Sequence, residues 1–255
     1  MCYNDSDKGG VIMSNPVMRR LSEQSENEAV IDGNSLMTVN GSIEKTAFLG
    51  LILVVAAGIV WSKFTAGYTD IGTMLTGIGA IAGFITALII IFARVKVLIP
   101  VYAALEGFFL GGISAIMESS YPGVVSQAVL GTFMTLFVML MLYRANVIRC
   151  TEKFRSTVII ATASVVGIYL VDLIGHFFGY SVPVINEAST GGIIFSVVVV
   201  AIAALNLIID FDFIEKGAQR MLPKKYEWFG AFGLMVTIVW LYLEILKLLA
   251  KTSRR

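Results

Sequence analysis

Charged residues, histidine and cysteine are all scarce in this chain. Of its 255 residues, 15% are charged, one is a histidine and two are cysteines, Cys2 and Cys150. One histidine and two cysteines cannot supply the Cys/His cluster of a zinc site, and they do not indicate a disulfide framework. We therefore expect a chain without a resident metal, cofactor or structural disulfide.

The motifs of several enzyme classes are also missing. The sequence has no Gly-Lys-Ser or Gly-Lys-Thr loop to hold phosphates, which argues against an ATP-driven pump. Ser114 is expected at the height of His176, but the glycine-framed setting of a serine nucleophile is incomplete. Asp172 and Asp210 differ in expected height and no Gly-x-Gly-Asp loop is present, which argues against an intramembrane aspartyl protease. We expect a protein that is not an enzyme.

Hydrophobic residues, in contrast, make up 57% of the sequence, well above their share in soluble domains. Most of the apolar runs reach the ~17–25 residues that a helix needs to cross a bilayer. Small-residue pairs such as Gly79/Gly83 and Gly107/Gly111 predict close helix contacts. The sequence thus predicts an all-α integral membrane protein, a bundle of seven transmembrane helices at roughly 46–62, 71–93, 98–117, 124–143, 157–178, 191–213 and 228–249.

Polar residues gather at the two ends of the chain. Residues 1–45 contain scattered Ser, Asn, Asp and Glu without periodicity, which predicts a mobile N-terminal tail. They lack the basic start, apolar core and cleavage site of a signal peptide. The expected organisation is this tail, a transmembrane domain over 46–250 and a short basic C-terminal tail over 251–255.

Positively charged loops predict the orientation, because short loops rich in Lys and Arg stay in the cytoplasm. The loops after the first, third and fifth runs hold only Lys63. We expect a cytoplasmic N-terminus and an external C-terminus, with Lys251, Arg254 and Arg255 on the less usual side; a re-entrant last segment is the alternative. The loops after the second, fourth and sixth runs hold Arg94, Lys96, Arg144, Arg149, Lys153, Arg155, Lys216, Arg220, Lys224 and Lys225.

Carboxylates inside the apolar runs are the candidates for function, because burying an ionised carboxylate costs several kcal/mol. At a rise of ~1.5 Å per residue, Glu106 lies roughly 12 Å from the cytoplasmic edge, and Asp210 and Asp212 lie within about a turn of it. Arg94 ends the second run at the same edge. These four residues form an expected inner layer, although Asp212 could be a helix-end residue reaching water and Arg94 a topology anchor.

A second acidic layer is expected near the outer edge. Asp172 lies roughly 22 Å up the fifth run, and His176 follows one turn later on the same face. Glu244 comes out at a similar height. The alternatives are a local Asp172–His176 pair and a surface pair of Glu244 with Lys247 that reaches the outer headgroups.

Three stretches resemble the transmembrane Bax inhibitor motif family. They are YAALEGFFLGGIS (102–114), IIDFDFIEKG (208–217) and AFGLMVTIVWLYLEILKLL (231–249), which are similar to the family's third, sixth and seventh spans. The resemblance covers about residues 46–250. It implies a seven-helix bundle whose bacterial members are pH-sensitive calcium leak channels of the plasma membrane, gated by a pair of carboxylates on the last two spans that share a proton.

Asp210 matches the first carboxylate of that pair, and two alignments compete for the second. Matching the Leu-Tyr-Leu-acid motif assigns Glu244, whereas matching the whole helix assigns Thr237. Expected depth favours Thr237, roughly 13 Å from the inner edge, over Glu244 near 24 Å. The chain is therefore expected to lack the carboxylate pair, so that any pH response of Asp210 would depend on Asp212, Glu106 or its surroundings.

The expected function is thus a calcium leak in the lipid bilayer, with Asp210 and Glu106 as oxygen ligands of the passing ion. A proton-coupled transporter would use the same carboxylates as a relay. A regulatory protein that binds a membrane quality-control protease is the third possibility, suggested by the resemblance and the polar tail. Nothing in the sequence indicates binding of nucleic acid.

Overall fold

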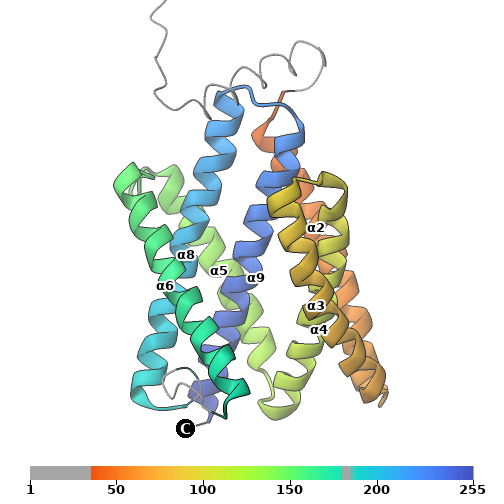
Figure 1. Ribbon diagram of the computed structural model, residues 1–255. Coiled ribbons are helices and arrows are strands. Elements are labelled where there is room, and N and C mark those ends of the chain that lie inside the picture. The colour runs from red at the N-terminus through yellow and green to blue at the C-terminus, as the bar shows by residue number, and fades with distance from the viewer. Residues whose placement is uncertain (1–35, 180–184, 186, 255) are drawn as a thin grey trace, which may run out of the picture.

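Seven long helices form the described part of the chain, residues 36–179, 185 and 187–254 of this computed structural model. Each is long and apolar enough to cross a membrane. The predicted all-α bundle of seven spans is confirmed. Successive helices run in opposite directions (Figure 1): α2 (Val39–Thr65), α3 (Thr69–Ala93), α4 (Ile99–Ser120), α5 (Val124–Arg144), α6 (Glu152–Phe177), α8 (Thr190–Gln219) and α9 (Lys225–Ser253).

The helices extend beyond the apolar runs because their polar ends continue the helical hydrogen bonding outside the hydrocarbon. α8 runs six residues past 213, the expected limit of its span, and α9 continues into the predicted C-terminal tail. α9 contains 29 residues, a length of about 43 Å, which exceeds the ~30 Å of bilayer hydrocarbon. A continuous helix of this length is long enough to cross the membrane in one piece.

Residues 36–45, assigned from the sequence to a mobile tail, are part of the bundle. Met37 is buried, and its backbone N–H donates to the carbonyl of Leu222 over 2.7 Å. The fully buried carboxylate of Glu227 accepts hydrogen bonds from the backbone and hydroxyl of Thr38, at 2.9 and 3.0 Å, and pairs with Lys45. This contact fastens the start of α2 to the start of α9. Residues 1–35 of the predicted tail lie outside the described residues.

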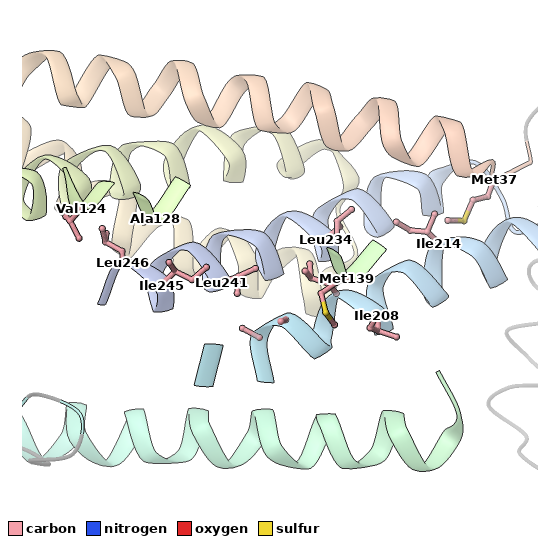
Figure 2. Packing of buried hydrophobic residues seen from close by; sticks show 13 residues of the cluster. Met37, Val124, Ala128, Met139, Ile208, Ile214, Leu234, Leu241, Ile245 and Leu246 are labelled. Carbon is pink, nitrogen blue, oxygen red and sulfur yellow. The ribbon is translucent and has the colours of Figure 1, made fainter. Parts of the chain in front are cut away.

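α9 is the central helix of the bundle. Of its apolar stretch, 67% is buried, whereas the other six helices range from 11% to 44%. Figure 2 shows α9 residues such as Leu234 and Leu241 beside Ile208 of α8 and Met139 of α5, within one apolar cluster. A second cluster joins α9 to α2 and α4. Side chains of α9 therefore face neighbours on several sides.

Small residues allow α4 to approach α2 closely. A Cβ atom at Gly107 would lie 2.4 Å from the carbonyl oxygen of Leu53, and one at Gly111 would lie 2.4 Å from that of Ala57. Any larger residue at these two positions would collide with backbone. The predicted role of this glycine pair in helix packing agrees with the structure.

Candidate functional site

Asp210 lies on α8 and faces α9. Its Oδ1 atom is 3.5 Å from the position of a Cβ at Gly233, so the glycine leaves room for the carboxylate. The Thr237 side chain, one turn further along α9, hydrogen-bonds to the carboxylate. The second oxygen, Oδ2, is buried and has no hydrogen-bond partner in the described part of the chain. Because buried polar atoms are nearly always paired, this oxygen marks a candidate site.

The two competing positions on α9 lie in different surroundings. Thr237 is beside Asp210, whereas Glu244, two turns further on, contacts Tyr169 and Lys247. The residue that faces Asp210 is therefore a hydroxyl donor and not a second carboxylate. A carboxylate next to a hydroxyl can be protonated or bind a cation without a competing negative charge.

Asp212, two residues after Asp210, is only 5% exposed and does not reach water as a helix-end residue would. Its Oδ2 atom lies 2.9 Å from Arg155 of α6 and 2.8 Å from Lys216, one turn later on α8. Two basic side chains thus neutralise it. This arrangement holds α6 to α8 and leaves Asp212 little capacity to bind a passing cation.

Glu106 points from α4 toward α3. Its Oε2 atom is 3.4 Å from the position of a Cβ at Gly83, and it hydrogen-bonds to the Tyr102 side chain on its own helix. Glu106 and Asp210 therefore face different helices, α3 and α9. Among the described residues, no three His, Cys, Asp or Glu side chains are grouped closely enough to hold a metal ion. The role of Asp210 and Glu106 as a ligand pair for a passing ion stays a prediction.

The sequence matches a known protein family. Residues 15–254 match the family model described as Bax inhibitor 1 like. The chain belongs to this family. No curated protein matches it. The family match begins 31 residues before the resemblance expected at 46, so it includes part of the segment predicted to be a tail. Membership of the Bax inhibitor 1 like family and seven apolar helices together fit a multi-pass integral membrane protein.

In this Bax inhibitor 1 like chain, Arg94 lies apart from these carboxylate contacts. It is exposed at the end of α3, where its backbone adopts a left-handed conformation with φ of 54°. Its backbone N–H donates to the carbonyl of Ile90 and so closes the helix. The position suits a residue that ends a span at the membrane surface.

The expected outer layer is only partly brought together. Glu244 is only 1% exposed, so the expected position of its pair with Lys247 at the surface is wrong. The pair itself is present, because the Lys247 ammonium donates to the Glu244 carboxylate over 3.1 Å. The hydroxyl of Tyr169 on α6 donates to Glu244 over 2.8 Å. Asp172 is half-buried on the next turn of α6, and His176 is exposed near the end of that helix. Tyr169 is the residue of α6 that reaches Glu244.

Lys251 is a buried residue that sequence reasoning placed in a basic tail. It is 8% exposed, and its ammonium group donates to the carbonyl of Gly192 over 3.2 Å and to the hydroxyl of Ser196 over 2.8 Å. A signal was available, because Glu244, Lys247 and Lys251 are spaced three and four residues apart and share one face of α9. Charges on one face of a long apolar helix indicate a polar interior contact.

Ser114, considered for a protease nucleophile, has a different partner. Its hydroxyl lies 2.6 Å from the hydroxyl of Tyr242 on α9. This hydrogen bond joins α4 to the central helix, while His176 is exposed on α6. Ser114 therefore contributes to packing between α4 and α9.

Proposed function

We propose that the protein is a cation leak channel, with calcium as the expected ion, and that the protonation state of Asp210 controls the flux. The observation that carries the proposal is the buried Oδ2 atom of Asp210, which lacks a hydrogen-bond partner among the described residues. Membership of a family of multi-pass membrane proteins supports it. The central position of α9, which forms one wall of the Asp210 site, supports it further.

Physical chemistry links this oxygen to both protons and cations. An ionised carboxylate with an unpaired buried oxygen is unfavourable by several kcal/mol. A proton removes the charge, and a cation neutralises it, so the two compete for the same atom. Calcium accepts oxygen ligands in irregular geometry, and the Thr237 hydroxyl and backbone carbonyls can add to the carboxylate. Occupancy of Asp210 then depends on pH and on cation concentration.

Five carboxylates of the bundle differ in whether a basic side chain neutralises them. Asp212, Glu227 and Glu244 each pair with at least one basic residue. Asp210 and Glu106 form no ion pair within the described residues. We therefore assign the control of flux to Asp210 and an auxiliary, separate oxygen site to Glu106.

The test is calcium flux into dye-loaded liposomes that contain the purified protein, measured across about pH 6 to 8. We expect a flux that varies with pH in the wild type. Asp210→Asn should remove the pH dependence, because the amide keeps the size of the side chain and cannot titrate. Glu106→Gln should change the size of the flux but keep its pH dependence. Asp70→Asn is the matched control, since Asp70 is exposed in the first turn of α3.

Each of three results would contradict this proposal. Flux at the level of empty liposomes, with insertion verified, would favour a regulatory protein that binds a membrane protease. Flux that saturates and follows an imposed proton gradient would favour a transporter. A pH dependence that survives in Asp210→Asn would remove Asp210 as the controlling group.

A further inference from the structure

α6 is the helix least embedded in the bundle. Only 11% of its apolar stretch is buried, and among its described side chains the buried ones are Val158 and Val165. In a bilayer, apolar surface gains little by leaving lipid for another helix, so packing and polar contacts hold helices together. With so little packing, α6 depends on its polar contacts.

Three of the polar contacts that join α6 to α8 and α9 in the described part of the chain are regularly spaced. Arg155 contacts Asp212 over 2.9 Å. Thr162 accepts a hydrogen bond from Asn206 over 2.8 Å, and Tyr169 donates to Glu244 over 2.8 Å. We call these three contacts the α6 ties.

The ties follow a heptad pattern on α6. Arg155, Thr162 and Tyr169 are seven residues apart, and the buried Val158 and Val165 lie three residues after the first two. These are the a and d positions of a helix that packs along its whole length against a partner. The ties span about 21 Å of the helix axis, roughly two thirds of the bilayer hydrocarbon. One continuous face of α6 therefore carries all of them.

Each partner residue on α8 or α9 keeps a second contact that does not involve α6. Asp212 pairs with Lys216, and Glu244 pairs with Lys247. The Asn206 amide also donates to the carbonyl of Ile202 over 2.9 Å. After loss of the ties, Asp212 and Glu244 would each keep a basic partner, so detachment would avoid the large penalty for leaving a paired buried charge alone.

We propose that α6 is a separately movable helix that is latched to α8 and α9 by the three α6 ties and detaches as one unit. Weak apolar packing, regular polar contacts and a second partner for every contacted residue together point to this movement. Detachment would expose a polar face of α8 and α9 on the side of the bundle. The proposal concerns the movement of α6 and stands apart from cation flux.

Cys150 provides a natural reporter for the movement. Its thiol lies beside both Arg155 and Asp212, at the first of the ties. Cys2→Ser leaves Cys150 as the single thiol of the chain. The rate at which a maleimide labels Cys150 in the folded, membrane-reconstituted protein then reports how often this end of α6 opens.

The decisive variant is Tyr169→Phe, which removes only the tie at the far end of α6. If α6 detaches as one unit, the labelling rate of Cys150 should rise about threefold to tenfold, the range expected for one lost interhelical hydrogen bond in a membrane. Thr162→Val should give a similar rise. Tyr242→Phe is the matched control, because it removes an interhelical hydrogen bond between α9 and α4 and leaves the α6 ties intact.

Two outcomes would overturn the proposal. An unchanged labelling rate in both Tyr169→Phe and Thr162→Val would show that the ends of α6 open independently. An equal rise in Tyr242→Phe would show a general loosening of the bundle instead of a movement of α6. Because the readout is thiol labelling, an absence of calcium flux would leave this conclusion intact.

Discussion

Asp210 and Asp212 are separated by one residue, yet their carboxylates have opposite surroundings. Positions two apart on a helix point about 200° apart, so Asp210 faces α9 and Asp212 faces α6. The basic residues Arg155 and Lys216 neutralise Asp212, whereas Asp210 meets a hydroxyl and a glycine. The Asp-Phe-Asp segment thus provides one carboxylate for helix attachment and one that remains available to a proton or a cation.

Cys150, between α5 and α6, gives a prediction at the residue scale. Burial raises the pKa of its thiol, and the nearby Asp212 carboxylate acts in the same direction. Only the thiolate reacts with alkylating agents. A raised pKa lowers the thiolate fraction at any pH below it, so we expect iodoacetamide to react more slowly with the folded protein than with the unfolded chain near about pH 8.

The measurement is the alkylation rate of the Cys2→Ser variant as a function of pH, in the folded protein and in denaturant. The midpoint should lie at higher pH in the folded protein. A midpoint at or below that of the unfolded chain would contradict the burial of the thiol. The Arg155 guanidinium, which favours the thiolate, is then the dominant influence on Cys150.

Sequence reasoning gave an expected depth for each of these residues but not the direction in which its side chain points. Expected depth favoured Thr237 over Glu244 as the residue nearer to Asp210, and in the structure Thr237 hydrogen-bonds to Asp210. The direction in which each helix faces depends on its neighbours, which the sequence of one helix does not contain. For this reason Glu244 and Lys251, expected near the surface, lie in the interior.

At the scale of elements, Gly79 allows the backbones of α3 and α4 to approach each other closely. A Cβ atom at Gly79 would lie 2.5 Å from the carbonyl oxygen of Leu105 and 2.6 Å from the backbone nitrogen of Phe109. Backbone atoms cannot move aside as a flexible side chain can. We expect Gly79→Ala to push α3 away from α4 and to destabilise the protein by about 1–3 kcal/mol.

Gly77 offers a matched control on the same helix. A Cβ atom there would have no neighbour within 4 Å, so Gly77→Ala should be neutral or slightly stabilising, since alanine favours helices over glycine. Thermal unfolding of the two variants in the same detergent is the measurement. Equal melting temperatures for Gly79→Ala and the wild type would mean that the two helices do not rely on this close approach.

Helix number and type followed from the sequence because apolar length is a strong signal in a membrane protein. Helix ends did not, because they also depend on contacts with residues far away in the sequence. α2 starts at Val39, seven residues before the apolar run, where the Thr38 hydroxyl accepts from the backbone of Gly41. The contact of Glu227 with this turn joins residues that are 189 positions apart. No local pattern reveals such a partner.

For the whole molecule, the seven helices have similar apolar composition but different places in the bundle. The mean hydropathy of α9 is 1.9 and that of α6 is 2.2, while 67% and 11% of their stretches are buried. Hydropathy cannot separate a helix surrounded by protein from one surrounded by lipid, because both environments are apolar. The placement of polar residues separates them better, since α9 carries Glu227, Glu244 and Lys251, all buried.

A prediction about the whole molecule is the orientation of the helix bundle in the membrane. Basic residues near the C-terminus opposed the assignment of an external C-terminus. Lys251 is buried inside the bundle and Lys247 pairs with Glu244, so neither acts as a free charge in a tail. At the other end, Arg155 and Lys216 pair with Asp212, and the eight further basic residues there still outweigh the remaining charges near the C-terminus, which favours a cytoplasmic N-terminus.

Cysteine labelling in intact cells can decide the orientation, using a variant with Cys2 and Cys150 replaced by Ser. Thr65→Cys is exposed at the end of α2, and Arg220→Cys is exposed at the opposite end, after α8. A membrane-impermeant maleimide should label Thr65→Cys in intact cells and Arg220→Cys only after permeabilisation. The reverse pattern would place the ten basic residues outside. Asp210, which is nearer the end that carries Arg220, would then take its protons from the external medium, so the sidedness of the pH response depends on this result.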